Sequence, residues 1–178
     1  MRARAVRFPA PTLGTFGTMQ LTYKHTYNGT PEQVVALMRN KDFIIDVAKH
    51  AGATSHDVQI DGNVTQLRMS LPVPGDVAKF VGKDVDLSQR FEWAEPAADG
   101  TSTGQVNVSV KGLPVTVEAT AVLRPTGAAT TGEYSGDLRV KIPLVGGKVE
   151  KMVAPFIEQA FAGIERRAQE WLARDQQG

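Results

Sequence analysis

A serine motif is the first feature of this sequence that suggests chemistry. Gly100-Thr101-Ser102-Thr103-Gly104 matches the G-x-S-x-G pattern of a hydrolase nucleophile elbow. In such an elbow the serine lies on a turn between a strand and a helix. Here the motif follows a turn rich in proline, alanine and glycine, and it leads into alternating valines. We therefore interpret it as a hairpin loop of small residues, with no catalytic role.

The histidines do not form a metal-binding pattern. The chain has His25, His50 and His56, without H-x-x-x-H or H-E-x-x-H spacing, and it has no cysteine to complete a zinc site. We expect solvated or helix-capping roles for His50 and His56. The glycine-rich phosphate-binding patterns are also absent from the sequence. The sequence thus predicts no metal, no cofactor and no catalytic residue set.

The composition excludes several classes of partner. The 178 residues carry a formal net charge of +1, so no global field attracts nucleic acid. The pair Arg166-Arg167 is interpreted as solvated. No stretch reaches the ~18 apolar residues of a membrane span, so we expect no integral membrane segment. The lack of cysteine fits a reducing cytoplasm, which is the predicted location. The oligomeric state stays open.

The chain divides into a tail and one domain. Residues 1–18 hold three arginines and no acidic residue, and prolines and glycines interrupt them. We predict a disordered N-terminal tail over 1–18 and a single ligand-binding domain over 19–175. A chain of this length can bury a hydrophobic core without disulfides.

Alternating and capping patterns predict the first elements of the domain. Residues 20–28 alternate between apolar and polar side chains, which indicates a strand. Thr30, Pro31 and Gln33 then form a capping box with proline at the first helical position. The sequence predicts a short helix after Thr30 and a second one over 42–50.

Six further strands are predicted to follow as a meander. Asp61-Gly62 suits a two-residue type I′ hairpin. The short connections force antiparallel neighbours, and the two-residue period means that only one face of the sheet is covered. The clearest alternating segments lie at 63–71, 87–93, 105–110, 115–123 and 134–142. A helical turn is expected over 76–81, between the first two of them.

A long amphipathic helix is the predicted cover for that face. Apolar residues recur at three- and four-residue spacing from Val149 to Leu172, while charged residues, Glu150 among them, mostly occupy the other side. Pro155 interrupts the helix and should bend it.

The inner face of the sheet is the candidate site. Its side chains vary in size, and a bent sheet is wide for one helix to fill, so we expect a dry cavity that accepts apolar ligands. Gln89 and Tyr134 are polar groups on that face, and each needs a partner. An ordinary packed core remains the alternative. The expected lining residues are Leu67, Met69, Gln89, Phe91, Trp93, Val108, Val117, Ala119, Tyr134, Leu138, Met152, Phe156 and Ala160.

The order of elements resembles the START-like or Bet v 1-like (SRPBCC, helix-grip) superfamily over residues 19–173. The segment Lys141–Glu150, the pair Trp171-Leu172 and the strand Gln89–Trp93 resemble an uncharacterised actinobacterial branch of unknown function. The segment Asp42–Ile45 departs from this pattern, because a bulkier aromatic residue is expected there.

The resemblance implies an α+β helix-grip fold, in which a curved seven-stranded antiparallel sheet surrounds the C-terminal helix. It also implies binding or carriage of a small hydrophobic partner, such as a lipid, a sterol or a polyketide-like molecule. Two alternatives remain open. One is a polyketide cyclase-like enzyme that uses Tyr134 and Gln89. The other is a protein-interaction module that uses the charged helix face around Glu165, Arg166 and Arg167.

Overall fold

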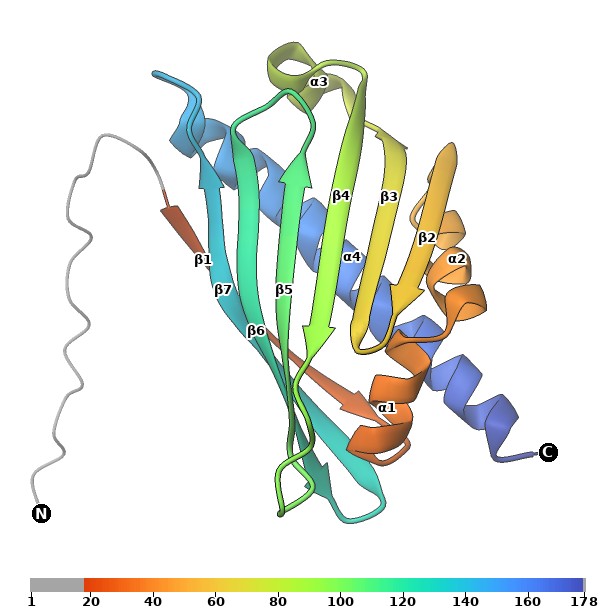
Figure 1. Cartoon of the computed structure of the whole chain (residues 1–178). Helices are drawn as coiled ribbons and strands as arrows, with labels where there is room; N and C mark the ends of the chain where they lie inside the picture. Colours follow the sequence, from red (N-terminus) through yellow and green to blue (C-terminus); the bar gives the residue numbers. More distant parts are fainter. Residues whose placement is uncertain (1–17, 178) are drawn as a thin grey trace, which may run out of the picture.

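The computed structural model describes residues 18–177, and its elements follow one another in the predicted order (Figure 1). Residues 1–17 of the predicted tail lie outside the described residues, and Thr18 already begins the first strand. The strands are β1 Thr18–Tyr27, β2 Ser55–Asp61, β3 Val64–Pro72, β4 Asp84–Trp93, β5 Ser102–Val110, β6 Val115–Thr126 and β7 Ala129–Val140. The helices are α1 Pro31–Met38, α2 Lys41–His50, α3 Gly75–Val81 and α4 Gly146–Asp175.

The strands form one seven-stranded sheet in the order β1-β7-β6-β5-β4-β3-β2, with antiparallel pairing throughout. The first strand joins the end of the meander because β1 pairs with β7. Helix α4 runs obliquely behind the sheet, and α1 and α2 lie beside its C-terminal half (Figure 1). The predicted fold class is therefore confirmed.

Local sequence signals explain how the short helices begin. The Thr30 hydroxyl accepts a hydrogen bond from Gln33 N, and the Gln33 side chain accepts one from Thr30 N, which completes the predicted capping box. Asn40 caps α2 through Asp42 N and Phe43 N. Both helices therefore have fixed starting points in the segment that follows β1.

The β2–β3 turn differs from the prediction by one residue. Asp61 pairs with Val64, so the two loop residues are Gly62 and Asn63. Only Gly62 has a positive φ, of 55°. A type I′ turn requires positive φ at both central residues, so the predicted turn type was wrong although the hairpin was right.

Two packed clusters hold the sheet and the helices together. The first, which we call the α1–α2 cluster, packs α1, α2 and the C-terminal part of α4 on one end of the inner face. The second, the β7–α4 cluster, packs the start of α4 on β1 and β7. The buried members of the α1–α2 cluster are Tyr27, Val34, Leu37, Met38, Phe43, Ile44, Ala48, Val58, Leu67, Trp93, Ala121, Leu123, Tyr134, Ala168 and Leu172. Those of the β7–α4 cluster are Leu21, Leu138, Val140 and Val149.

Two charged residues of α4 are less exposed than the sequence suggested. Glu150, predicted on the polar face, is 4% exposed and accepts a hydrogen bond from Val140 N at 3.2 Å. It thereby joins the end of β7 to the start of α4. The Arg167 side chain, predicted to be solvated, is only 14% exposed because it reaches Asp46 of α2.

Close packing of β6 on β7 depends on a glycine. A Cβ atom at Gly136 would lie 2.2 Å from the Glu118 carbonyl oxygen and 2.5 Å from Ala119 Cβ. The neighbouring strand β6 therefore occupies the space next to Gly136.

The outer edge of β1 is covered by side chains of α4. Thr26 N donates to Glu165 Oε1 at 2.8 Å, and Asn28 N donates to Gln169 Oε1 at 3.0 Å. Gln169 Nε2 donates to the Thr26 carbonyl, and Gln176 Nε2 donates to the Asn28 carbonyl. The backbone groups at this end of the edge strand are therefore paired within the molecule. None of the helices within residues 18–177 is long and apolar enough to cross a membrane.

Candidate functional site

The strand residues predicted to line the cavity lie in adjacent rows on one face of the sheet. The cross-strand pairs place Leu67, Gln89, Val108, Val117 and Leu138 in a single row across β3 to β7. Their side chains therefore share the face that α4 covers. Phe91 and Ala119 follow in the next row, Trp93 and Tyr134 in the row beyond it, and Met69 lies in the row on the other side.

Burial divides this set into packed ends and a partly open middle. Leu67, Trp93 and Tyr134 are buried in the α1–α2 cluster, with Met69 packed against it. Leu138 is buried in the β7–α4 cluster, with Val117 packed against it. Ala119 is buried, at 8% exposure.

Gln89, Phe91 and Val108 lie between the two clusters. They belong to neither cluster and remain partly exposed, although they share the inward face with Leu67 and Leu138. The middle of the inner face is therefore less tightly covered than its two ends.

The α4 residues of the predicted set lie on one side of that helix. Ala160 is exposed, Met152 is partly exposed, and Phe156 is 41% exposed. Arg167 and Trp171 follow Phe156 and Ala160 by eleven residues, which is about three helical turns. Since Arg167 and Trp171 bind Asp46 of α2, Phe156 and Ala160 lie on the side of α4 that turns toward α2.

Asp46 fixes the distance between α2 and α4. Its Oδ2 accepts from Arg167 Nε at 2.6 Å and from Trp171 Nε1 at 3.0 Å. Partial burial opposes ionisation, but the hydrogen bonds from Arg167 and Trp171 outweigh it and hold the pKa of Asp46 below its ordinary value. The charged pair keeps the two helices together beside the inner face.

A buried polar chain lies at the β1 side of the site. His25 Nδ1 is 2.9 Å from the Tyr27 hydroxyl, which is 2.7 Å from the Tyr134 hydroxyl. His25 and Tyr134 are each 4% exposed and Tyr27 is fully buried. The Tyr134 hydroxyl has no other hydrogen-bond partner among residues 18–177.

The hydroxyl protons of this chain assign the histidine tautomer. If Nδ1 carried the proton, one of the two tyrosine hydroxyl hydrogens would have no acceptor, which is costly in a buried site. If Nδ1 is bare, Tyr134 donates to Tyr27, Tyr27 donates to His25, and both hydroxyl protons have an acceptor. The network therefore assigns the neutral His25 ring as the Nε2–H tautomer.

Burial controls the ionisation of these three groups. It lowers the pKa of His25 below its usual value, and the nearby Glu165 carboxylate only partly opposes this effect. Burial also raises the pKa of Tyr134 to about 12 and that of Tyr27 well above its ordinary value. These shifts favour the neutral form of all three groups near pH 7. The trio is therefore suited to hydrogen bonding and not to acting as a strong base.

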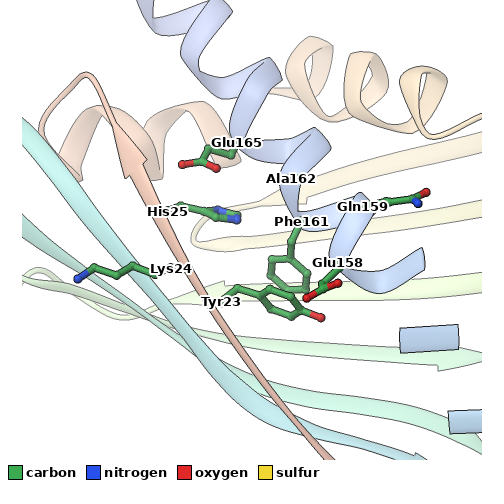
Figure 2. Close-up of a pocket in the computed structure, with 8 residues that line it drawn as sticks. All are labelled: Tyr23, Lys24, His25, Glu158, Gln159, Phe161, Ala162 and Glu165. Carbon is green, nitrogen blue, oxygen red and sulfur yellow. The ribbon is translucent and has the colours of Figure 1, made fainter. Parts of the chain in front are cut away.

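A recess of about 370 Å³ opens beside His25, between β1 and α4 (Figure 2). Tyr23 and Phe161 stack within it at 4.3 Å between ring centroids. His25 Nε2 binds none of the described residues and is not enclosed, so it is accessible from the recess. A second recess, of about 330 Å³, lies on the outer face of the sheet over β3 to β6.

The predicted lining residues do not form the recess beside His25. Its lining includes none of them, and the outer recess includes only Gln89, Val108 and Val117, whose side chains alternate toward the inner face. Among the residues that the structure describes, no group of three or more His, Asp or Glu side chains could hold a metal ion.

Residues 22–172 match a protein family model described as a protein of unknown function, DUF2505. The chain belongs to the DUF2505 family. An uncharacterised protein of Mycobacterium tuberculosis and one of Mycobacterium bovis are each 25% identical to this DUF2505 chain over 166 residues, covering 84% of it and 94% of the relative. The predicted membership of an uncharacterised actinobacterial branch is confirmed.

Solved structures with the same architecture are distant in sequence. Zhui aromatase/cyclase from Streptomyces sp. R1128 superposes with a TM-score of 0.63 at 9% identity, covering 89% of the DUF2505 chain and 95% of the other. Norcoclaurine synthase from Thalictrum flavum gives a TM-score of 0.59 at 14% identity, covering 92% and 99%. At these identities the similarity shows the Bet v 1-like helix-grip fold of the DUF2505 protein and no more.

Sequence reasoning missed the polar chain of this DUF2505 protein. The alternation over residues 20–28 puts His25 and Tyr27 on the same face of the first strand, but it assigns no role to either. The signal was their position among Leu21 and Tyr23, because a histidine and a tyrosine on a covered face both need hydrogen-bond partners. The partner Tyr134 is 107 residues away, so its contact with Tyr27 had no local signature.

Proposed function

We propose that this protein binds and carries a small hydrophobic molecule between the inner face of its sheet and α4. One observation carries the proposal: Gln89, Phe91 and Val108, in the middle of the inner face, stay partly exposed while both ends of that face are packed. Apolar side chains that face a covering helix are normally buried, because exposure costs about 25 cal/mol per Å². A hydrophobic guest would remove that surface from water.

The position of α4 supports the same interpretation. Phe156, 41% exposed, lies on the side of α4 toward α2, which would put it next to the partly open middle of the sheet. The exposed side of α4 and the partly exposed middle of the inner face would then form two walls of one binding site. The Asp46–Arg167 pair would hold the wall formed by α4 in place.

Gln89 is the polar group that would orient the guest. It lies in the partly exposed middle of the inner face, and its side chain hydrogen-bonds to none of the residues 18–177. Apolar pockets commonly use a few such groups to fix the orientation of a ligand. We therefore expect a molecule with one polar end, such as a lipid, a sterol or a polyketide-like compound.

The experiment combines native mass spectrometry of the purified protein with titration of a fluorescent fatty acid and a fluorescent sterol. Val108→Phe fills the site, and Ser109→Phe places the same ring on the exposed outer face of β5 as a control. Displacing about two methylene groups of ligand costs about 1.6 kcal/mol, or about 15-fold in affinity. We expect that loss for Val108→Phe only. Absence of binding at tens of micromolar, with no co-purifying molecule, would contradict the proposal.

A further inference from the structure

The recess between β1 and α4 has a chemical character unlike that of the inner face. Glu158 and Glu165 both line it, and neither forms an ion pair with any of residues 18–177. Lys24 also lines the recess, but Figure 2 shows Lys24 and Gln159 extending away from the other labelled side chains. The recess therefore carries negative charge that the described part of the protein leaves unpaired.

Glu165 is held in a defined position. Its Oε1 accepts a hydrogen bond from the backbone N–H of Thr26 at 2.8 Å, while Oε2 binds no group that the structure describes. A carboxylate anchored by one oxygen presents the other to a ligand without further loss of side-chain entropy. Glu165 can therefore accept a charge-assisted hydrogen bond from a cation.

His25 is the second, independent feature of the recess. The residue is only 4% exposed, yet its Nε2 is accessible from the recess and bonds to none of the described residues. The tautomer assigned by the hydroxyl protons makes Nε2–H a donor, and the chain of Tyr27 and Tyr134 behind it holds the ring in that tautomer. A ligand oxygen is the natural acceptor for this N–H.

The wall of the recess is aromatic. Tyr23 and Phe161 stack at 4.3 Å with an interplanar angle of 15°. Aromatic faces attract cations and apolar groups alike. The carboxylate, the N–H donor and the aromatic wall together specify a small molecule with three matching parts.

We propose that this recess binds a small organic ammonium compound that also carries a hydroxyl or carbonyl oxygen. The ammonium group binds the free oxygen of Glu165, the ligand oxygen accepts from His25 Nε2–H, and the apolar part packs on Tyr23 and Phe161. Glu158 adds negative potential. The inference does not depend on binding of a hydrophobic molecule at the inner face.

Three probes with the same aromatic body separate these contributions. 2-Amino-1-phenylethanol carries both polar groups, 2-phenylethylamine lacks the hydroxyl, and 1-phenylethanol lacks the amine. Titration of the full chain, followed by NMR, should give the tightest binding for the first, with shifts centred on His25 and Phe161. Loss of the amine should weaken binding about tenfold or more, because hydrogen bonds to charged groups are the stronger class.

Variants test the two carboxylates. Glu165→Gln keeps an oxygen to accept from Thr26 N and should weaken amine binding about tenfold. Glu158→Gln, which removes a carboxylate that no hydrogen bond holds in place within residues 18–177, should weaken it about 2- to 5-fold. Glu95→Gln removes the same charge from the exposed β4–β5 loop and should leave binding unchanged.

The histidine is tested in the unmodified protein, so folding of a variant does not enter. Nitrogen chemical shifts of His25 should report a proton on Nε2 and none on Nδ1. A proton on Nδ1 would overturn the proposal, and so would equal binding of 1-phenylethanol and the amino alcohol. Unchanged amine binding by Glu165→Gln would also overturn it.

Discussion

Replacement of Gly136 by alanine should destabilise the fold strongly, although it adds only one methyl group. The added Cβ would lie 2.2 Å from the Glu118 carbonyl oxygen and 2.5 Å from both Cα and Cβ of Ala119. All three are well inside contact distance, and two of them belong to the backbone. The conflict is therefore relieved only if β6 and β7 move apart.

The size of this effect follows from overpacking in a closely packed sheet. Such substitutions cost about 1–3 kcal/mol when side chains can adjust, and backbone contacts place Gly136→Ala at about 3 kcal/mol or more. For a domain of this size each kcal/mol lowers the melting temperature by about 2–4 °C. We therefore expect a melting temperature lower by about 6–12 °C.

The assay is thermal and urea unfolding followed by circular dichroism. Gly147→Ala is the matched control, because the same Cβ there meets no atom within 4 Å and the residue lies in the first turn of α4. Alanine should leave stability unchanged or raise it by up to about 1 kcal/mol in a helix. A Gly136→Ala protein within about 0.5 kcal/mol of wild type would show that β6 and β7 can separate at little cost, contrary to this prediction.

Two further predictions concern polar contacts, one partly buried and one buried. Asp46→Asn should cost about 1–2 kcal/mol of stability in urea unfolding, and Asp42→Asn, at an exposed position of the same helix, is the control. Because the pKa of Asp46 is lowered in the folded state, the stability difference from wild type should be complete above about pH 4. It should shrink as the pH falls through the folded pKa. A constant difference down to pH 2 would contradict this. Tyr27→Phe breaks both bonds of the polar chain and should cost about 2 kcal/mol, against about 1 kcal/mol for Tyr134→Phe, in the same assay; equal losses would argue against a linear chain.

The alternating segments of the sequence predicted the sheet because each strand keeps one covered face and one exposed face along its length. Val64 to Pro72 shows this clearly, with Thr65 and Leu67 buried and Gln66 and Arg68 exposed. Short turns then fixed antiparallel neighbours and, with them, the rows of the inner face. The position of the turn at Gly62 was predicted one residue too early, because Asp61 is compatible with both strand and turn.

The rotation of α4 was harder to predict from spacing. The apolar stripe is wide enough to include both Val153, which packs on the β7–α4 cluster, and Phe156, which is exposed. The contact between Asp46 and Arg167 sets the rotation of α4 and thereby decides which of the two residues is covered. It joins residues 121 apart in sequence. Such a pair has no local pattern, and the same holds for the Tyr27–Tyr134 contact.

The side chains of α4 that cover the edge of β1 have a consequence for self-association. An unpaired edge strand is a template on which a strand from another molecule can add. Here Glu165, Gln169 and Gln176 occupy the backbone groups of Thr26 and Asn28. Loss of the last turns of α4 would expose these groups, so a truncated chain would be prone to intermolecular strand pairing and aggregation.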